Sequence, residues 1–229
     1  MYTSQFRQLV EKFIKEAHYP ENFNIEEFSS IPTFKGRLQY CDKKLQRLGV
    51  GSSRIVYKIN DERVLKIAKN TKGVAQNQKE ADFGRNAYGI TTNVYDIDYD
   101  NYGWIEMELA YPIKKGEVND LIGISFEELI GVICYIHDEY AKPNDKLFKR
   151  YNYDSTIIKE IMEKQIYTEK NSFLYRLYTF LLDYQPTYVY DYCRIKNWGK
   201  VLRNGQWQMV ITDDGFDENV AKLYHKSLQ

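Results

Sequence analysis

The sequence contains few cysteines and no excess of charge of either sign. Only three of its 229 residues are cysteine, and Cys41, Cys134 and Cys193 lack the spacing of metal ligands or of a redox pair. We therefore expect reduced thiols in a cytoplasmic protein. Lys plus Arg number 32, as do Asp plus Glu. A net charge of zero argues against nucleic acid or an anionic membrane as the main partner.

Long apolar runs are absent as well. No run is long enough to span a bilayer, and residues 1–5 lack the basic and apolar regions that begin a secretion signal. The chain has no Walker-type phosphate loop and no serine in a nucleophile elbow. Its three histidines have no partner at metal-ligand spacing.

What the chain does contain is a series of short β-type segments followed by helical ones. We expect a loop over residues 19–36 with at most a short helical turn, and a polar linker over 112–119. Three antiparallel strands are expected within 44–67. Further strands are expected over 94–98, 104–109, 199–202 and 208–212. Helices are expected over 4–17, 74–85, 126–140, 155–167, 172–184 and 218–227.

A glycine-rich turn falls between the first two expected strands. Glycine lets backbone N–H groups come close to phosphate oxygens, and serine hydroxyls add donors. Arg54 could contact a phosphate or simply be solvated, and Val56 could cover an adenine ring. A plain hairpin explains the same residues. The candidate nucleotide contacts in this segment are Gly49, Gly51, Ser52, Ser53, Arg54 and Val56.

The next strand carries a lysine among apolar residues. A buried Lys66 needs an anionic partner, and phosphates or a carboxylate could supply it. Glu80 is the best candidate carboxylate because it lies inside the following helix. Alternatively, Lys66 lies on the solvated face of a half-exposed strand.

A second polar group lies near the end of the sequence. Asp213 ends an apolar strand, where a carboxylate could ligate Mg²⁺ that bridges two phosphates. Asn197 could offer a second oxygen, and Asp191 could accept a proton from a substrate hydroxyl. Each of these residues is also a common turn former, so their significance depends on occurring in this order after the glycine turn and the lysine strand.

In that order the residues resemble the protein kinase-like fold, over roughly Leu45 to Phe216. The resemblance implies a glycine-rich loop over Leu48–Val56 and a hinge over Met107–Ala110, whose Glu108 and Ala110 backbone would meet the adenine. It implies catalytic roles for Lys66, Glu80 and Asp191, and metal ligation by Asn197 and Asp213. More narrowly, the chain is similar to small kinase-like proteins encoded by tailed bacteriophages.

The sequence departs from the family pattern at four points. Arg54 replaces the third glycine of the loop, and Asp214 replaces the Phe of the metal motif. Asp191 and Asn197 are separated by one residue more than is usual in the family. Only residues 217–229 follow the metal motif, whereas a protein kinase needs further helices there to bind a peptide. These departures argue against phosphorylation of a protein in the usual groove.

Together these patterns predict an α+β chain with a minimal two-lobed kinase-like fold that binds ATP and Mg²⁺ between its lobes. The expected parts are an N-terminal helical extension (1–43), an N-lobe with a five-stranded antiparallel sheet and one helix (44–112), and a truncated, mainly helical C-lobe (113–229).

The implied activity is ATP-dependent phosphoryl transfer to a protein or small-molecule acceptor that the sequence does not identify. The alternative is a pseudokinase that serves as a structural or interaction module, in a phage virion or directed at a host protein. The expected location is the cytoplasm, that of the host or the virion if a phage encodes the chain.

Overall fold

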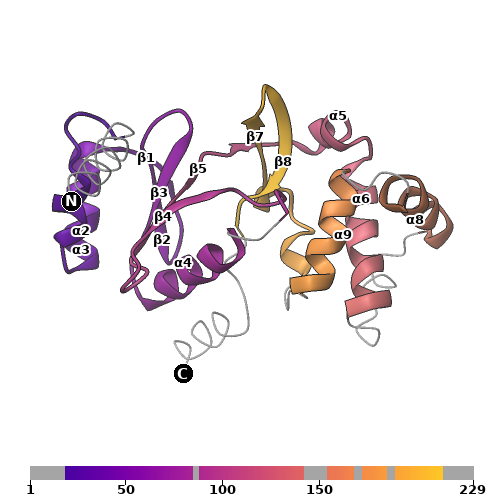
Figure 1. Ribbon diagram of the computed structural model, residues 1–229, viewed down its shortest axis with the longest axis horizontal. Coiled ribbons are helices and arrows are strands. Elements are labelled where there is room, and N and C mark those ends of the chain that lie inside the picture. Colours follow the sequence, from indigo (N-terminus) through magenta and orange to yellow (C-terminus); the bar gives the residue numbers. More distant parts are fainter. Residues whose placement is uncertain (1–18, 85–87, 142–153, 168–171, 185–188, 214–229) are drawn as a thin grey trace, which may run out of the picture. The chain divides into compact units, whose positions relative to one another are not determined.

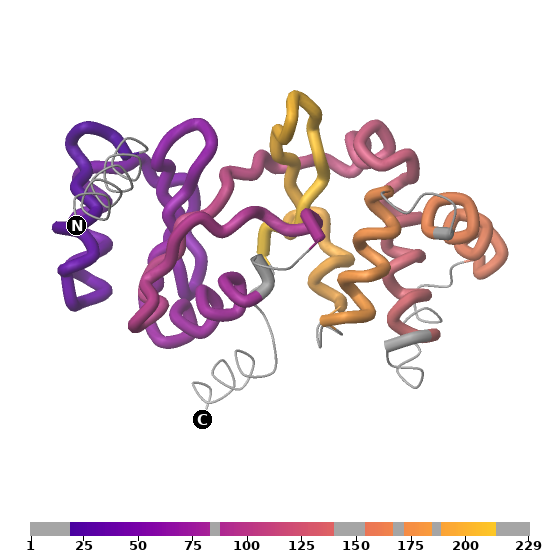
Figure 2. Tube along the Cα trace, viewed as in Figure 1, coloured from indigo at the N-terminus to yellow at the C-terminus, as the bar shows by residue number. Residues whose placement is uncertain are grey.

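The computed structural model describes residues 19–84, 88–141, 154–167, 172–184 and 189–213. The predicted helices over 4–17 and 218–227 lie outside these ranges. The chain divides into two compact units (Figures 1 and 2). The first comprises Met1–Ala81 and Val94–Leu109, and the second comprises Asp82–Asn93 and Ala110–Gln229.

The first unit contains a five-stranded antiparallel sheet with the order β1-β2-β3-β5-β4. Its third strand is followed by the helix α4 (Thr71–Gly84). The prediction of an α+β chain whose five-stranded sheet carries one helix after its third strand is therefore confirmed. The strands are β1 (Gln46–Val50), β2 (Arg54–Lys58), β3 (Arg63–Ala68), β4 (Val94–Ile97) and β5 (Trp104–Glu108).

The two faces of this sheet bury different residues, because side chains alternate along a strand. Leu65 and Trp104 lie on the face covered by α2 and α3, where an aromatic cluster around Phe28 packs. Lys66 and Ile105 lie on the opposite face, which packs against α4 through Ala81. Figure 1 shows the sheet between these helices. The sheet is thus buried on both faces.

The prediction of a loop over residues 19–36 is wrong. The segment contains α2 (Ile25–Ser30), and α3 (Phe34–Lys44) begins before its end. Asn24 and Thr33 cap these helices by accepting hydrogen bonds from the backbone N–H groups of Glu27 and Gly36. Pro20 and Pro32 lie outside both helices. Burial of apolar side chains from α2 and α3 against the sheet stabilises two helices that are short on their own.

The second unit is mainly helical, as predicted, but the linker over 112–119 is not an irregular chain. It contains the end of β6 (Tyr111–Pro112), a 3₁₀ turn (Lys115–Glu117) and the start of α5 (Val118–Ile122). The apolar Val118 and Ile113 are buried there, which orders the segment. The other helices are α6 (Phe126–Ile136), α8 (Ser155–Met162) and α9 (Phe173–Tyr184).

Two of the predicted helices change geometry before they end. Single π-helical turns continue α6 over His137–Ala141 and α8 over Glu163–Tyr167. A capping box begins α6, since the Ser125 hydroxyl and the Glu128 carboxylate each accept a hydrogen bond from the other residue's backbone N–H, at 3.1 and 2.7 Å. Within the described ranges, the structure contains no helix with the length and apolar character needed to cross a membrane.

A small antiparallel sheet, β6-β7-β8, completes the second unit. β7 (Trp198–Arg203) and β8 (Gln206–Ile211) form the hairpin that the sequence predicts. Asn204 and Gly205 make its turn with positive φ angles of 54° and 74°, a backbone conformation that Asn and Gly adopt most readily. Trp198 begins β7 and Ile211 ends β8, and both side chains are buried in the helical core. The hairpin thereby fixes the segments on either side of it, residues 189–197 and 212–213.

Candidate functional site

Lys66 occupies the middle of β3, on the face of the sheet that packs against α4. Its neighbours across the ladders are Val56 on β2 and Ile105 on β5. The lysine is 9% exposed. A charged ammonium in such an apolar setting requires a compensating anion, so the solvated alternative for Lys66 is excluded.

Glu80 supplies that anion from α4. Its Oε2 lies 2.8 Å from the Lys66 ammonium and its Oε1 lies 2.8 Å from the Arg54 guanidinium. Burial of Glu80 would raise its carboxyl pKa, but the charges of Arg54 and Lys66 outweigh burial and lower it. The structure therefore brings Lys66 and Glu80 together as an ion pair, and Arg54 joins them.

Arg54 is buried rather than solvated. Its side chain is 9% exposed, and its second guanidinium nitrogen donates a hydrogen bond of 3.3 Å to the Asn77 side-chain oxygen. Two cations thus share the single carboxylate of Glu80, so the trio of Arg54, Lys66 and Glu80 carries a net positive charge. Such a group favours the approach of an anionic ligand.

The glycine-rich segment forms a tight hairpin between β1 and β2. The Gly51 backbone N–H donates to the Arg54 carbonyl at 2.9 Å, and the ladder is irregular between Arg47 and Gly49. Ser52 is exposed at the tip. The Ser53 hydroxyl, which we predicted as a phosphate donor, is buried and donates to the side chain of Gln76 on α4. The hairpin is therefore attached to the helix that carries Glu80.

Gly73 allows this close attachment. A Cβ at position 73 would lie 2.3 Å from the Ser53 carbonyl oxygen and 2.9 Å from the Ala68 Cα, both of them backbone atoms. The same Ser53 carbonyl accepts the Lys69 backbone N–H at 2.7 Å. The end of β3, the hairpin and the first turn of α4 consequently meet at a single point that has no space for a side chain.

Replacing Gly73 with alanine should lower the free energy of unfolding by about 1–3 kcal/mol, because the overlap can be relieved only by moving backbone. Gly49→Ala, in the hairpin that Gly73 faces, is the matched control. Among the described residues, no atom beyond its chain neighbours lies within 4 Å of its added Cβ, so its effect should stay within about 0.5 kcal/mol. Urea unfolding of both variants measures the difference, and equal stabilities would contradict the steric argument.

The other predicted nucleotide contacts lie along the same sheet. Val56 is directly opposite Lys66 and packs beside Ile105 and Met107. Glu108 ends β5, where it pairs with Arg63 of β3. Ala110 is the first residue of the second unit after this strand. Val56 thus shares a face with Lys66, whereas the Glu108 side chain lies on the α2–α3 face, so only the backbone of Glu108 suits the role predicted for it.

The second unit brings the other three predicted residues together. The Asn197 side-chain nitrogen donates to the Asp191 carbonyl at 2.9 Å, and the Thr212 backbone N–H donates to the Asn197 carbonyl at 2.9 Å. Asp213 follows directly and is exposed. The first bond assigns the Asn197 nitrogen as the donor, which leaves its Oδ1 as the atom that could ligate a cation.

Asp191 ends a 3₁₀ turn (Val189–Asp191), and its side chain is 26% exposed. Burial raises its carboxyl pKa; Arg194, 3.7 Å away, lowers it and the Asp213 charge raises it, with a net rise. A carboxylate with a raised pKa is a better proton acceptor than an ordinary one.

The donors in this group suit a hard cation. Among the described residues, no cluster of three or more His, Cys, Asp and Glu side chains could hold a metal. Mg²⁺, however, is commonly bound by one or two protein oxygen ligands together with waters and phosphate oxygens. The Asp213 carboxylate and the Asn197 Oδ1 are ligands of that kind, so they fit Mg²⁺ that arrives with a nucleotide.

Two functional contacts were missed in the sequence. Gln76 and Asn77 lie one helical turn before Glu80, on the α4 face that meets the sheet, and both are buried. The spacing of residues 73, 76, 77 and 80 places them on one side of a helix, which is a local signal. Only the fold, however, shows that this polar stripe receives Ser53 and Arg54.

No protein-family description and no curated protein sequence matches this chain. Among solved structures, the chain is similar to a GDP complex of an aminoglycoside 2′-phosphotransferase-IIIa variant, with a TM-score of 0.37 and 13% identity over 78% of this chain and 68% of that chain. It is also similar to the ternary complex of APH(2″)-IIa with streptomycin and ATP, with a TM-score of 0.32 and 15% identity over 86% and 73% of the two chains. A third is aminoglycoside phosphotransferase APH(2″)-Ib with ADP, with a TM-score of 0.33 and 14% identity over 81% and 70%. Similarity at this level carries no functional argument, and the function proposed below is based on the residues alone.

Proposed function

We propose that this protein binds ATP with Mg²⁺ and transfers the γ-phosphate to an acceptor, as a kinase-like phosphotransferase. The observation that carries the proposal is the buried trio of Lys66, Glu80 and Arg54 next to the glycine hairpin. Burial of Lys66, Arg54 and Glu80 removes three charged groups from water, and each of them loses favourable solvation energy. An anionic ligand that binds there would offset part of that cost.

In this proposal the first unit holds the nucleotide. Lys66 contacts the phosphates, Glu80 orients Lys66, and the backbone of Gly49 and Gly51 with the Ser52 hydroxyl donates to phosphate oxygens. Arg54 adds positive charge close by. Val56 covers the base, and the backbone around Glu108 and Ala110 meets its edge. Fixed charges of this kind lower the barrier to phosphoryl transfer chiefly by positioning and charge neutralisation.

The second unit would supply the remaining groups. Asp213 and Asn197 would hold Mg²⁺, which neutralises charge that develops on the phosphates. Asp191 would accept the proton of the acceptor hydroxyl, a role that its raised pKa favours. The hydrogen bonds from Asn197 to the Asp191 carbonyl and from Thr212 to the Asn197 carbonyl hold these residues near one another.

A pseudokinase that binds nucleotide without transfer is the second candidate. It is favoured by the presence of Arg54 on the carboxylate that would otherwise serve Lys66 alone. The extra residue between Asp191 and Asn197 favours it too. Nucleotide binding without transfer of radiolabelled γ-phosphate to water, to the protein itself or to added acceptors would identify this alternative.

Saturating Mg-ATP should stabilise the protein. At a concentration a hundredfold above its dissociation constant, a ligand raises the free energy of unfolding by about 2.7 kcal/mol, which a thermal-shift titration detects. Lys66→Met should lose most of this shift, because the lysine that meets the phosphates is gone. Lys58→Met is the matched control on the same face, since Lys58 pairs with Asp61 at the surface. Absence of a shift in the unaltered protein would refute the proposed function.

A further inference from the structure

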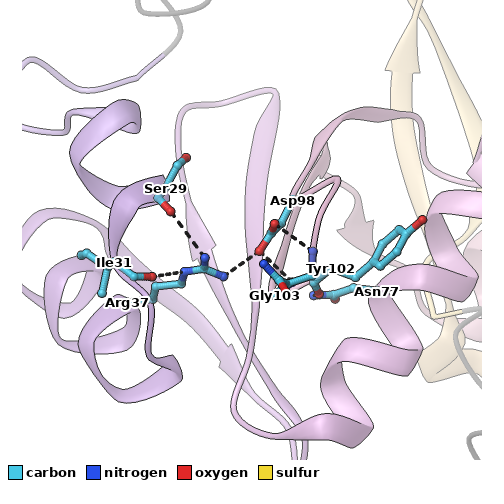
Figure 3. Close-up of polar contacts among 8 residues, drawn as sticks. Ser29, Ile31, Arg37, Asn77, Asp98, Tyr102 and Gly103 are labelled. Atoms are coloured by element: carbon cyan, nitrogen blue, oxygen red, sulfur yellow. Dashed lines mark hydrogen bonds and ion pairs between the residues drawn. The ribbon is translucent and has the colours of Figure 1, made fainter.

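A second buried ion pair lies in the first unit, on the opposite side of the sheet from Lys66. Arg37 of α3 contacts the Asp98 carboxylate at 2.8 Å, and the two side chains are 8% and 9% exposed. The same guanidinium donates to the Ile31 carbonyl at 2.8 Å and to the Ser29 carbonyl at 3.4 Å, at the end of α2 (Figure 3). Arg37 therefore joins both N-terminal helices to the residue that follows β4.

Asp98 organises the turn between β4 and β5. Its two carboxylate oxygens accept hydrogen bonds from the backbone N–H groups of Asn101 and Gly103, at 3.2 and 3.1 Å. Tyr102 has a positive φ of 50° within this turn, which is costly for a bulky residue and needs support from its surroundings. A Cβ at Gly103 would lie 2.1 Å from the Arg37 guanidinium. The turn is therefore shaped around the Arg37–Asp98 pair.

Asn77 connects this turn to α4. Its side-chain nitrogen donates to the Tyr102 carbonyl at 2.8 Å, and its oxygen accepts from Arg54 at 3.3 Å. The Asn77 side chain is fully buried, and Figure 3 shows it beside the turn. Arg54 then reaches Glu80, one helical turn beyond Asn77, and Glu80 reaches Lys66. An unbroken series of polar contacts, made by buried side chains and the backbone of the turn, therefore runs from Arg37 to Lys66.

We infer that Arg37 and Asn77 are positioning residues for the phosphate-binding pair, through which the α2–α3 helices set the affinity for nucleotide phosphates. The inference rests on the proposed function. Every side chain in the series is buried, so a broken contact would leave a buried polar group without that partner, and the neighbours would shift to recover it. The shift would reach Glu80 through Asn77 and Arg54.

The chain provides a matched control in Arg63. Arg63 and Glu106 form an ion pair of 2.6 Å on the same α2–α3 face, and their side chains are 20% and 3% exposed. Within the described part of the chain, this pair contacts Tyr19 and Tyr95 rather than α4. Arg37→Gln and Arg63→Gln therefore each remove a guanidinium from a buried carboxylate, but only Arg37→Gln interrupts the series that ends at Lys66.

The experiment compares dissociation constants for ATP and for adenosine, which lacks phosphates, in the full chain. Arg37→Gln should weaken ATP binding by about 2- to 30-fold, the range found for mutations along coupled networks, with little change for adenosine. Arg63→Gln should leave the ratio of the two constants unchanged. Arg37→Lys keeps the charge facing Asp98 and should restore most of the ATP affinity. Equal ratios for Arg37→Gln and Arg63→Gln would overturn the inference, as would failure of Arg37→Lys to restore binding.

Hydrogen exchange separates this inference from the proposed function. Without any nucleotide, the backbone amides around Glu80 should exchange faster in Arg37→Gln than in Arg63→Gln, since only the first variant loosens the α4 anchor. This difference is expected even if the protein binds no ATP, in which case the proposed function fails and the positioning of Glu80 by Arg37 stands. Equal exchange around Glu80 in the two variants would refute the positioning role.

Discussion

Replacing Asp213 with asparagine should abolish the stimulation of ATP binding by Mg²⁺ and lower γ-phosphate transfer by about 100-fold or more, as loss of one electrostatic contact in a transition state typically does. The change removes the charge of the proposed metal ligand and keeps its shape. Binding of ATP in the presence of a chelator should be unchanged, because the residues proposed to hold the phosphates are elsewhere in the chain. Calorimetric titration with and without Mg²⁺ measures the first effect, and radiolabelled ATP measures the second.

Asp120→Asn is the control for this experiment. Asp120 is an exposed carboxylate on α5 of the same unit, so its removal changes the net charge by the same amount without touching the proposed site. If Asp120→Asn and Asp213→Asn gave equal Mg²⁺ stimulation, the assignment of Asp213 as a ligand would be incorrect. If Asp213→Asn abolished γ-phosphate transfer but kept the stimulation of ATP binding by Mg²⁺, Asp213 would have a catalytic role other than metal ligation.

Glu80→Gln should be among the most destabilising substitutions in the chain. The glutamine keeps the size of the side chain but removes the only charge that opposes Arg54 and Lys66 in the trio. Removing one partner of a buried ion pair typically costs about 3–5 kcal/mol, and Glu80 contacts two cations. Urea unfolding measures the loss. Glu127→Gln, which breaks the exposed pair with Lys115, should cost less than about 1 kcal/mol.

The contribution of Glu80 should also depend on pH. Its carboxyl pKa is lowered in the folded protein, so the folded state binds the proton more weakly than the unfolded state does. The stabilisation is then fully present above the ordinary carboxyl pKa and is lost as the pH falls towards the lower pKa of the folded state. The difference in stability between the unaltered protein and Glu80→Gln should therefore shrink in acid. A difference that stayed constant over this range would contradict the ion-pair explanation.

Much of the first unit could be predicted because its signals are local. The strands are short runs of β-branched and aromatic residues separated by glycine and Asn-Asp turns, and the register of antiparallel neighbours follows from such turns. The lysine strand and the glutamate helix occur in order, so their pairing was a reasonable inference. The helices α2 and α3 were not predicted, because the segment contains Pro20 and Pro32 and prolines are typical of loops, although Asn24 and Thr33 are residues that commonly cap helices.

The contacts that tie the site together were not predictable in the same way. Arg54 and Glu80 are 26 residues apart, and nothing local shows that a residue leaving a glycine turn will point at α4 rather than into solvent. The Asn77 contact with the Tyr102 carbonyl depends on an unusual backbone conformation in a turn. Such contacts follow from how the turn, the sheet and the helix pack, which depends on many residues at once.

The Arg37–Asp98 pair also bears on how the protein can be shortened. A version trimmed to begin at β1 would lose Arg37, which pairs with Asp98. It would also lose Phe28, whose ring packs against Trp104. It would expose a carboxylate and a tryptophan together, a combination that invites aggregation and incomplete folding. Residues 19–44 should therefore be retained in any form of the protein prepared for binding or activity measurements.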